Sequence, residues 1–176
     1  LLLQRRLRQD DVVIAVAFDG RSDEQLADAI GPLTRYLPLR AAADAAPRLP
    51  GRATTLAQAL AEAEEWQEYF TWPSPRAESV WAPGYGFALS AAPTLPRARW
   101  LAHSAHEDRF QLKLGVLLDG DRLACTLSYE PARHREADMV CLLRQWRTLL
   151  EASLMQPQAP VAALAHVHAD ERTALL

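Results

Sequence analysis

The sequence predicts an α/β protein, a two-layer sandwich in which helices cover one face of a mixed β-sheet. Residues 10–20 contain a run of β-branched and small apolar side chains, as in a strand buried on both faces. Residues 110–129 alternate between apolar and polar side chains on either side of Asp119-Gly120, which predicts a β-hairpin. Residues 133–153 carry an apolar stripe at helical spacing, which predicts an amphipathic helix that packs on the sheet.

The start of the chain predicts a helix, a strand and a second helix. Residues 1–8 carry leucines on one face and arginines near the end, as in the last turns of a helix. The strand over residues 10–20 follows. Ser22, with Gln25 three positions later, forms a capping-box pattern that predicts a short helix over residues 23–30.

The stretch IGPLTRYLPLR, residues 30–40, places two arginines and two prolines in an otherwise apolar run. Gly31, followed by proline, predicts the end of the short helix. Residues 33–40 are expected to be extended. Because proline has no N–H, Pro38 confines them to a sheet edge or to a place where one N–H is not needed. On the residues alone, this is a solvated edge strand whose arginine stems cover apolar surface.

The middle of the chain predicts, in order, a loop, a helix opened by Thr54 or Thr55, an irregular proline-rich segment and two short strands. Their ranges are residues 41–53, 54–70, 72–83, 85–89 and 99–103.

The bulk composition argues against several classes of function. The chain has 176 residues and a net charge of −3, so no basic face favours nucleic acid. No apolar run approaches the ~18 residues that span a bilayer, so no membrane partner is expected. The first residues become charged too soon for a signal peptide and lack a methionine, which suggests that the chain begins partway through a longer one.

The two cysteines, Cys125 and Cys141, lie in apolar, periodic surroundings. We interpret them as buried thiols of a reducing compartment, the cytoplasm, with a disulfide between them as the alternative.

Two kinds of histidine pattern invite a chemical interpretation. His134 and Asp138 have the spacing of a His-x-x-x-Asp pair. At the start of the last helix this spacing puts both on one helical face, so we interpret the pair as structural. Residues 103–108, and His166 with His168, offer candidate metal ligands, but neither cluster shows a third well-placed ligand. No metal site is therefore predicted.

Four segments, in order along nearly the whole chain, resemble the C-terminal half of a condensation domain from nonribosomal peptide synthetases. One of them, IGPLTRYLPLR, is similar to the family pattern Ile-Gly-x-Phe-Val-Asn-Thr-Leu-x-x-Arg. The four are DDVVIAVAFDGR (residues 10–21), IGPLTRYLPLR (30–40), the hairpin end LSYE (127–130) and the exit PVAALAHVHADERTALL (160–176).

The resemblance implies one lobe of a chloramphenicol acetyltransferase-like fold. The complete enzymes of this family join two carrier-bound acyl or aminoacyl thioesters by amide formation. Their catalytic His-His-x-x-x-Asp-Gly motif belongs to the N-terminal half and is absent here, so no catalytic residue is expected in this chain. Residues 1–157 would form the subdomain, and residues 158–176 a tail or linker toward a following domain.

The same resemblance implies the partners. They are the N-terminal half of the domain, acyl or peptidyl carrier proteins and adjacent synthetase domains. Phosphopantetheine would arrive on the carrier proteins and would not be a bound cofactor of this chain. Gly31, Arg35, Tyr36 and Arg40 are the candidates for substrate-tunnel or carrier contact.

The sequence also departs from the family. Arg35-Tyr36 stands where the family has Asn-Thr, and residues 66–70, WQEYF, are a degenerate form of its His-Gln-Asp-x-Pro-Phe-Glu segment. The aromatic residues Trp66, Tyr69, Phe70 and Trp72 would line a channel or, alternatively, form a core face and a loop anchor. These departures leave a second hypothesis, a catalytically inactive condensation-like platform that recruits a carrier protein or tailoring enzyme.

Overall fold

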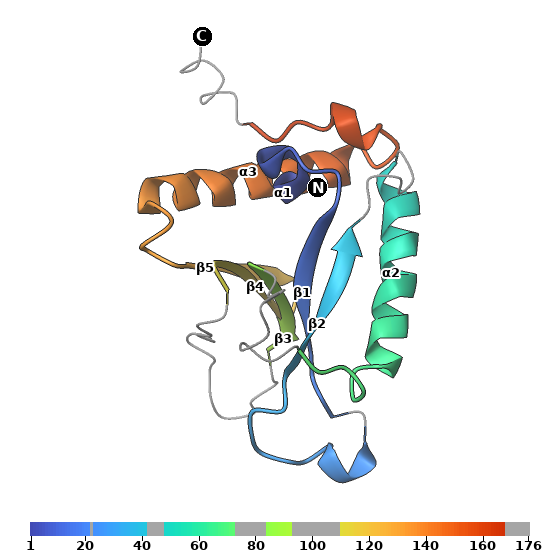
Figure 1. The fold of residues 1–176 in the computed structure, drawn as a ribbon. Coiled ribbons are helices and arrows are strands. Elements are labelled where there is room, and N and C mark those ends of the chain that lie inside the picture. The colour runs from blue at the N-terminus through green and yellow to red at the C-terminus, as the bar shows by residue number, and fades with distance from the viewer. Residues whose placement is uncertain (22, 42–47, 73–83, 93–109, 168–176) are drawn as a thin grey trace. The chain divides into compact units, whose positions relative to one another are not determined.

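The computed structural model describes residues 1–21, 23–41, 48–72, 84–92 and 110–167 (Figure 1). Helices and strands alternate along most of the chain. In order they are α1 (Leu2–Leu7), β1 (Val12–Phe18), the 3₁₀ turn η1 (Glu24–Leu26), β2 (Arg35–Ala41), α2 (Leu49–Glu65), β3 (Tyr85–Ala91), β4 (Leu112–Asp119), β5 (Arg122–Tyr129), α3 (Glu136–Met155) and the 3₁₀ turn η2 (Val161–Ala163).

Five strands form one mixed sheet in the order β2-β1-β3-β4-β5. Strand β3 runs parallel to both β1 and β4, and β4 and β5 are antiparallel. The α/β class with a mixed sheet is therefore confirmed. Strand β2 lies at the sheet edge, as Pro38 predicted, since an edge strand leaves some N–H groups unused.

The predicted hairpin is confirmed, with its turn one residue later than Asp119-Gly120. Asp119 pairs with Arg122 as the last rung of the ladder, so the loop is Gly120-Asp121. Gly120 has φ 60 and stands first in this two-residue loop, where glycine is favoured because a side chain would be strained.

The bounds predicted for the helices over residues 23–30 and 54–70 are wrong. The short helix over residues 23–30 is only the turn η1, and its cap is Asp23, whose carboxylate accepts a hydrogen bond from the Gln25 N–H at 2.8 Å. Past this turn, the Ala29 carbonyl accepts a hydrogen bond from the Arg21 guanidinium.

Helix α2 begins at Leu49, inside the segment predicted as a loop. Pro50 is tolerated there because the first helical turn has no partner for its missing N–H. Thr54 and Thr55 lie inside the helix, where their hydroxyls donate to the Pro50 and Gly51 carbonyls at 3.1 Å, so they do not cap it.

The chain divides into two compact units. The first comprises residues 1–12, 40–62 and 134–176, and helices α1 and α3 contact each other within it. The second comprises residues 13–39 and 63–133. It contains the sheet, except for some strand ends that belong to the first unit. None of the described helices is both long and apolar enough to cross a membrane.

The apolar stripe predicted for the last helix is confirmed in α3. Met139, Leu142 and Leu149 are buried, and Leu143, Trp146 and Leu150 are half-buried. The strand predicted over residues 99–103 lies outside the described residues.

Candidate functional site

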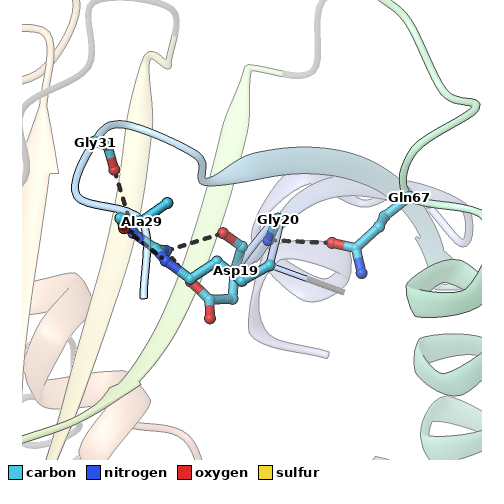
Figure 2. Close-up of polar contacts among 6 residues, drawn as sticks. Asp19, Gly20, Ala29, Gly31 and Gln67 are labelled. Atoms are coloured by element: carbon cyan, nitrogen blue, oxygen red, sulfur yellow. Dashed lines mark hydrogen bonds and ion pairs between the residues drawn. The ribbon is translucent and has the colours of Figure 1, made fainter. Parts of the chain in front are cut away.

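The loop between β1 and β2 is held by a glycine that no other residue can replace without moving the backbone. Gly20 has φ 71, and a Cβ built on it would lie 1.9 Å from the Leu33 carbonyl oxygen. This close approach also brings the Gly20 N–H to 3.2 Å from Oε1 of Gln67, a side chain only 3% exposed (Figure 2). The loop is thereby joined to the segment that follows α2.

Arg21 clamps the same loop through its guanidinium, whose partners Asp19, Ala29 and Gly31 are labelled in Figure 2. Its Nη2 donates to the carbonyls of Ala29 and Gly31 at 3.1 and 3.3 Å, and its Nη1 donates to the carbonyl and carboxylate of Asp19. Bonds from a charged donor are stronger than neutral ones. The clamp therefore fixes where the stretch that starts at Ile30 leaves the loop.

Gly31 and Arg35, two of the predicted site residues, both lie exposed on this unit. The Gly31 carbonyl is one of the Arg21 acceptors. Arg35 Nη1 donates to the carbonyls of Gln67 and Glu68, each at 3.4 Å. A cation here satisfies carbonyls just past the C-terminus of α2, where the helix dipole favours positive charge.

Tyr36 is buried in the same unit. Its ring lies 4.9 Å from that of Phe110, and Lys113 Nζ lies 5.1 Å from its centroid. The indole N–H of Trp72 donates to the Tyr36 carbonyl at 2.8 Å. The backbone and the ring of Tyr36 thus both take part in the core.

Lys113, the only lysine of the chain, was not singled out by the sequence analysis. It is 4% exposed and lies in β4, opposite Gly86 of β3 and Ser128 of β5. A cation over an aromatic ring gains electrostatic stabilisation when it is removed from water. In the alternating run, Lys113 falls between Leu112 and Leu114 on the polar face, so the pattern gave no signal of burial.

Arg40 lies in the other unit, where its guanidinium forms an ion pair with Asp11. Its Nε is 2.8 Å from both carboxylate oxygens. The hydrogen bond from Arg40 lowers the pKa of Asp11. The structure therefore places Gly31, Arg35 and Tyr36 in one unit and Arg40 in another, and the tunnel or carrier-contact role of all four stays a prediction.

The predicted helical pairing of His134 and Asp138 is wrong. Helix α3 starts at Glu136, with Arg135 as its extended N-cap, so His134 precedes the helix. Asp138 lies in the first turn, where its negative charge interacts favourably with the helix dipole, as expected. Among the described side chains, His134 Nε2 is a buried nitrogen without a hydrogen-bond partner.

In the part of the chain that the structure describes, no three or more His, Cys, Asp or Glu side chains gather as metal ligands. Residues 103–108 and His168 lie outside that part. Cys125 and Cys141 are free thiols and are half-buried, so the prediction of full burial is wrong. Burial raises the pKa of the Cys125 thiol.

A second polar cluster joins α1 to the end of the chain within the first unit. Arg5 Nη1 lies 2.8 Å from the Leu164 carbonyl and 2.8 Å from His166 Nδ1, and Arg5 Nη2 donates to the Val161 carbonyl. Val161 and Leu164 are buried. Desolvation lowers the pKa of His166, and the positive charge of Arg5 lowers it further.

Replacing Gly20 by alanine should destabilise the protein by about 3 kcal/mol or more, because the new methyl group meets the Leu33 carbonyl and the backbone is strained at positive φ. Gly120→Ala is the matched control. It has the same sign of φ but open space around the Cβ, so only about 1 kcal/mol is expected. Urea denaturation of both variants measures the difference, and equal losses would contradict the steric account.

The free energy of unfolding should fall as the pH drops through about 6.5, the ordinary pKa of histidine. The folded chain binds a proton at His166 less readily than the unfolded chain, because its pKa is lowered, so acid favours the unfolded state. His166→Gln should show a weaker pH dependence than the natural chain over this range. Since all other histidines are shared, the difference between the two urea midpoints isolates His166; identical pH profiles would refute this role.

Comparison with solved structures identifies the fold, while no family model and no curated protein matches the chain. The starter condensation domain of rhizomide synthetase RzmA aligns over 95% of this chain and 42% of its own, with a TM-score of 0.72 and 16% identity. The four-domain nonribosomal peptide synthetase holo-AB3403 aligns over 97% of this chain and 15% of its own, with a TM-score of 0.78 and 14% identity. The epimerization domain of tyrocidine synthetase B aligns over 84% of this chain and 37% of its own, with a TM-score of 0.59 and 16% identity.

These alignments confirm the resemblance at the level of the fold. The chain spans less than half the length of the starter condensation domain that it matches, which agrees with one half of such a domain. This chain therefore has the fold of part of a condensation domain.

Proposed function

We propose that this chain is the C-terminal lobe of a condensation-type domain that joins two carrier-bound acyl or aminoacyl thioesters by amide formation in nonribosomal peptide synthesis. One observation carries the proposal: nearly the whole chain aligns with well under half of a condensation domain. The order of the four sequence segments supports the assignment to the C-terminal half.

In the reaction, the amine of the acceptor attacks the thioester carbonyl of the donor. A C–N bond forms, the C–S bond breaks, the carrier thiol leaves, and the amine loses a proton. A group that takes this proton or positions the amine is needed for rate. The motif that would supply it, His-His-x-x-x-Asp-Gly, is absent from the sequence, so the N-terminal lobe provides it.

In this proposal, the lobe contributes a wall of the substrate tunnel and a surface on which a carrier protein docks. The Arg21 clamp fixes the start of the stretch that contains Gly31 and Arg35, and Arg35, the first residue of β2, is exposed. An exposed guanidinium suits the phosphate of a phosphopantetheine arm carried by a partner protein. Arg40, whose guanidinium is paired with Asp11 in the first unit, is a further candidate for carrier contact.

A catalytically inactive platform is the second candidate. It is favoured by Tyr36, whose ring is buried where the family has a smaller polar residue. The same fold also occurs in an epimerization domain, so the fold alone does not select amide formation. Both candidates fit the cytoplasm, with which the two free cysteines agree.

Amide formation should require both lobes. We expect no product from residues 1–176 alone with two carrier-loaded substrates, and product after addition of an N-terminal lobe that carries the histidine motif. Mass spectrometry of the carrier-bound product measures it. Turnover by this chain alone would refute the external base, and the absence of turnover with any active N-terminal lobe would favour the platform.

Arg35→Ala should slow the reconstituted enzyme roughly tenfold or more if the guanidinium contacts the carrier arm. The loss of stability should stay near 1 kcal/mol, because Arg35 is exposed and its two bonds are long. Arg147→Ala removes an exposed arginine paired with Glu151 in α3. It should change neither the rate of the reconstituted enzyme nor its stability. A large drop in melting temperature for Arg35→Ala, with an unchanged rate, would assign it a structural role only.

A further inference from the structure

The turn that follows α2 presents two aromatic side chains to solvent. Trp66 is 56% exposed and Tyr69 is 80% exposed. Their ring centroids are 5.7 Å apart at an angle of 59°. Residues 66–69 are called the aromatic turn below. Large aromatic side chains are seldom left this exposed without a partner, since Trp and Tyr are the residue types that most often dominate binding energy.

The inner side of the aromatic turn is anchored to the unit that carries it. The buried side chain of Gln67 accepts from the Gly20 N–H, and the carbonyls of Gln67 and Glu68 accept from Arg35. The Tyr69 N–H closes the turn on the Trp66 carbonyl at 3.1 Å. The two rings are therefore carried on a fixed backbone, which lowers the entropy lost when a partner binds.

The neighbouring aromatics, in contrast, are used internally. Phe70 and Trp72 are half-buried and meet edge to face, with centroids 5.0 Å apart. The aromatic set thus divides into an anchoring pair and an exposed pair. Trp66 and Tyr69 are therefore not part of the core.

Three acidic side chains lie next to the exposed pair in sequence, and the one cation described at this turn, Arg35, lies on its backbone carbonyls. Glu64, Glu65 and Glu68 are exposed and flank Trp66 and Tyr69 in sequence. Carboxylates at this density repel phosphate backbones and anionic lipid surfaces. They attract cations, and aromatic ring faces also attract cations.

We propose that the aromatic turn is a docking site for an arginine-bearing segment of another protein. A guanidinium can stack on the Trp66 or Tyr69 ring while its N–H groups donate to a neighbouring carboxylate. Lysine would fit less well, because its compact ammonium is more strongly hydrated and does not stack. This surface adjoins Arg35, the proposed carrier contact, through the Gln67 and Glu68 carbonyls, and it would serve either candidate function.

The full 176-residue chain can be titrated with a short alanine-spaced arginine peptide, with the same peptide built from lysine, and with its neutral citrulline analogue. Binding is followed by calorimetry and by the NMR signal of the Trp66 indole N–H. We expect the affinity order arginine, lysine, citrulline, and weaker binding at high salt. No binding of the arginine peptide, or equal binding of citrulline, would overturn the proposal.

Variants locate the site. Trp66→Leu and Tyr69→Leu should each weaken the arginine peptide roughly threefold, and the double variant about tenfold. Glu64→Gln with Glu65→Gln should weaken it further and reduce the salt dependence. The controls are Leu56→Ala, an exposed apolar position in α2, and Glu136→Gln, an exposed acid in α3, which should bind as the natural chain does.

Circular dichroism should show unchanged melting for the Trp66 and Tyr69 variants, because both side chains are exposed. Undiminished peptide binding by the double variant would overturn the site. A concentration-dependent dimer that disappears in the same double variant would replace the proposed partner with a second copy of this chain.

Discussion

The absence of a side chain at position 20 is the constraint on which the described part of the second unit depends. Gly20 lets the backbone of β1 turn against the Leu33 carbonyl, and the same approach presents its N–H to the buried Gln67. One residue later, Arg21 holds the far end of the loop through the Ala29 and Gly31 carbonyls. The entry of β2, the loop and the aromatic turn after α2 are thus fixed by contacts that begin at one glycine.

Much of the fold could be predicted because its signals are local. The β4–β5 hairpin follows from a glycine between two alternating runs, and the edge position of β2 follows from Pro38. Helix α3 follows from its apolar stripe. The hairpin, the edge strand and the helix each depend on steric or solvation preferences of residues that are neighbours in sequence, so they can be predicted from local patterns.

The candidate site could be predicted less well because its contacts join distant segments. Arg35 and Gln67 are 32 positions apart, and nothing local indicates that a guanidinium in an edge strand ends on carbonyls beyond a helix. Lys113 falls on the polar face of the alternating run, yet it is buried over Tyr36. The start of α2 was missed for a local reason, since Pro50 and Gly51 indicate a loop unless the first-turn exception is considered.

The arginines of residues 30–40 have partners that bear on which function is possible. Arg40 is paired with a carboxylate, whereas Arg35 rests on two carbonyls at 3.4 Å, which is long for a hydrogen bond. Water can replace such acceptors at small cost, so Arg35 can turn toward a phosphate without unfolding its surroundings. Tyr36 cannot leave its place so easily, because its ring and carbonyl are both engaged in the core. The proposed carrier-contact role therefore suits Arg35 better than Tyr36, because Arg35 belongs to the surface and Tyr36 to the interior.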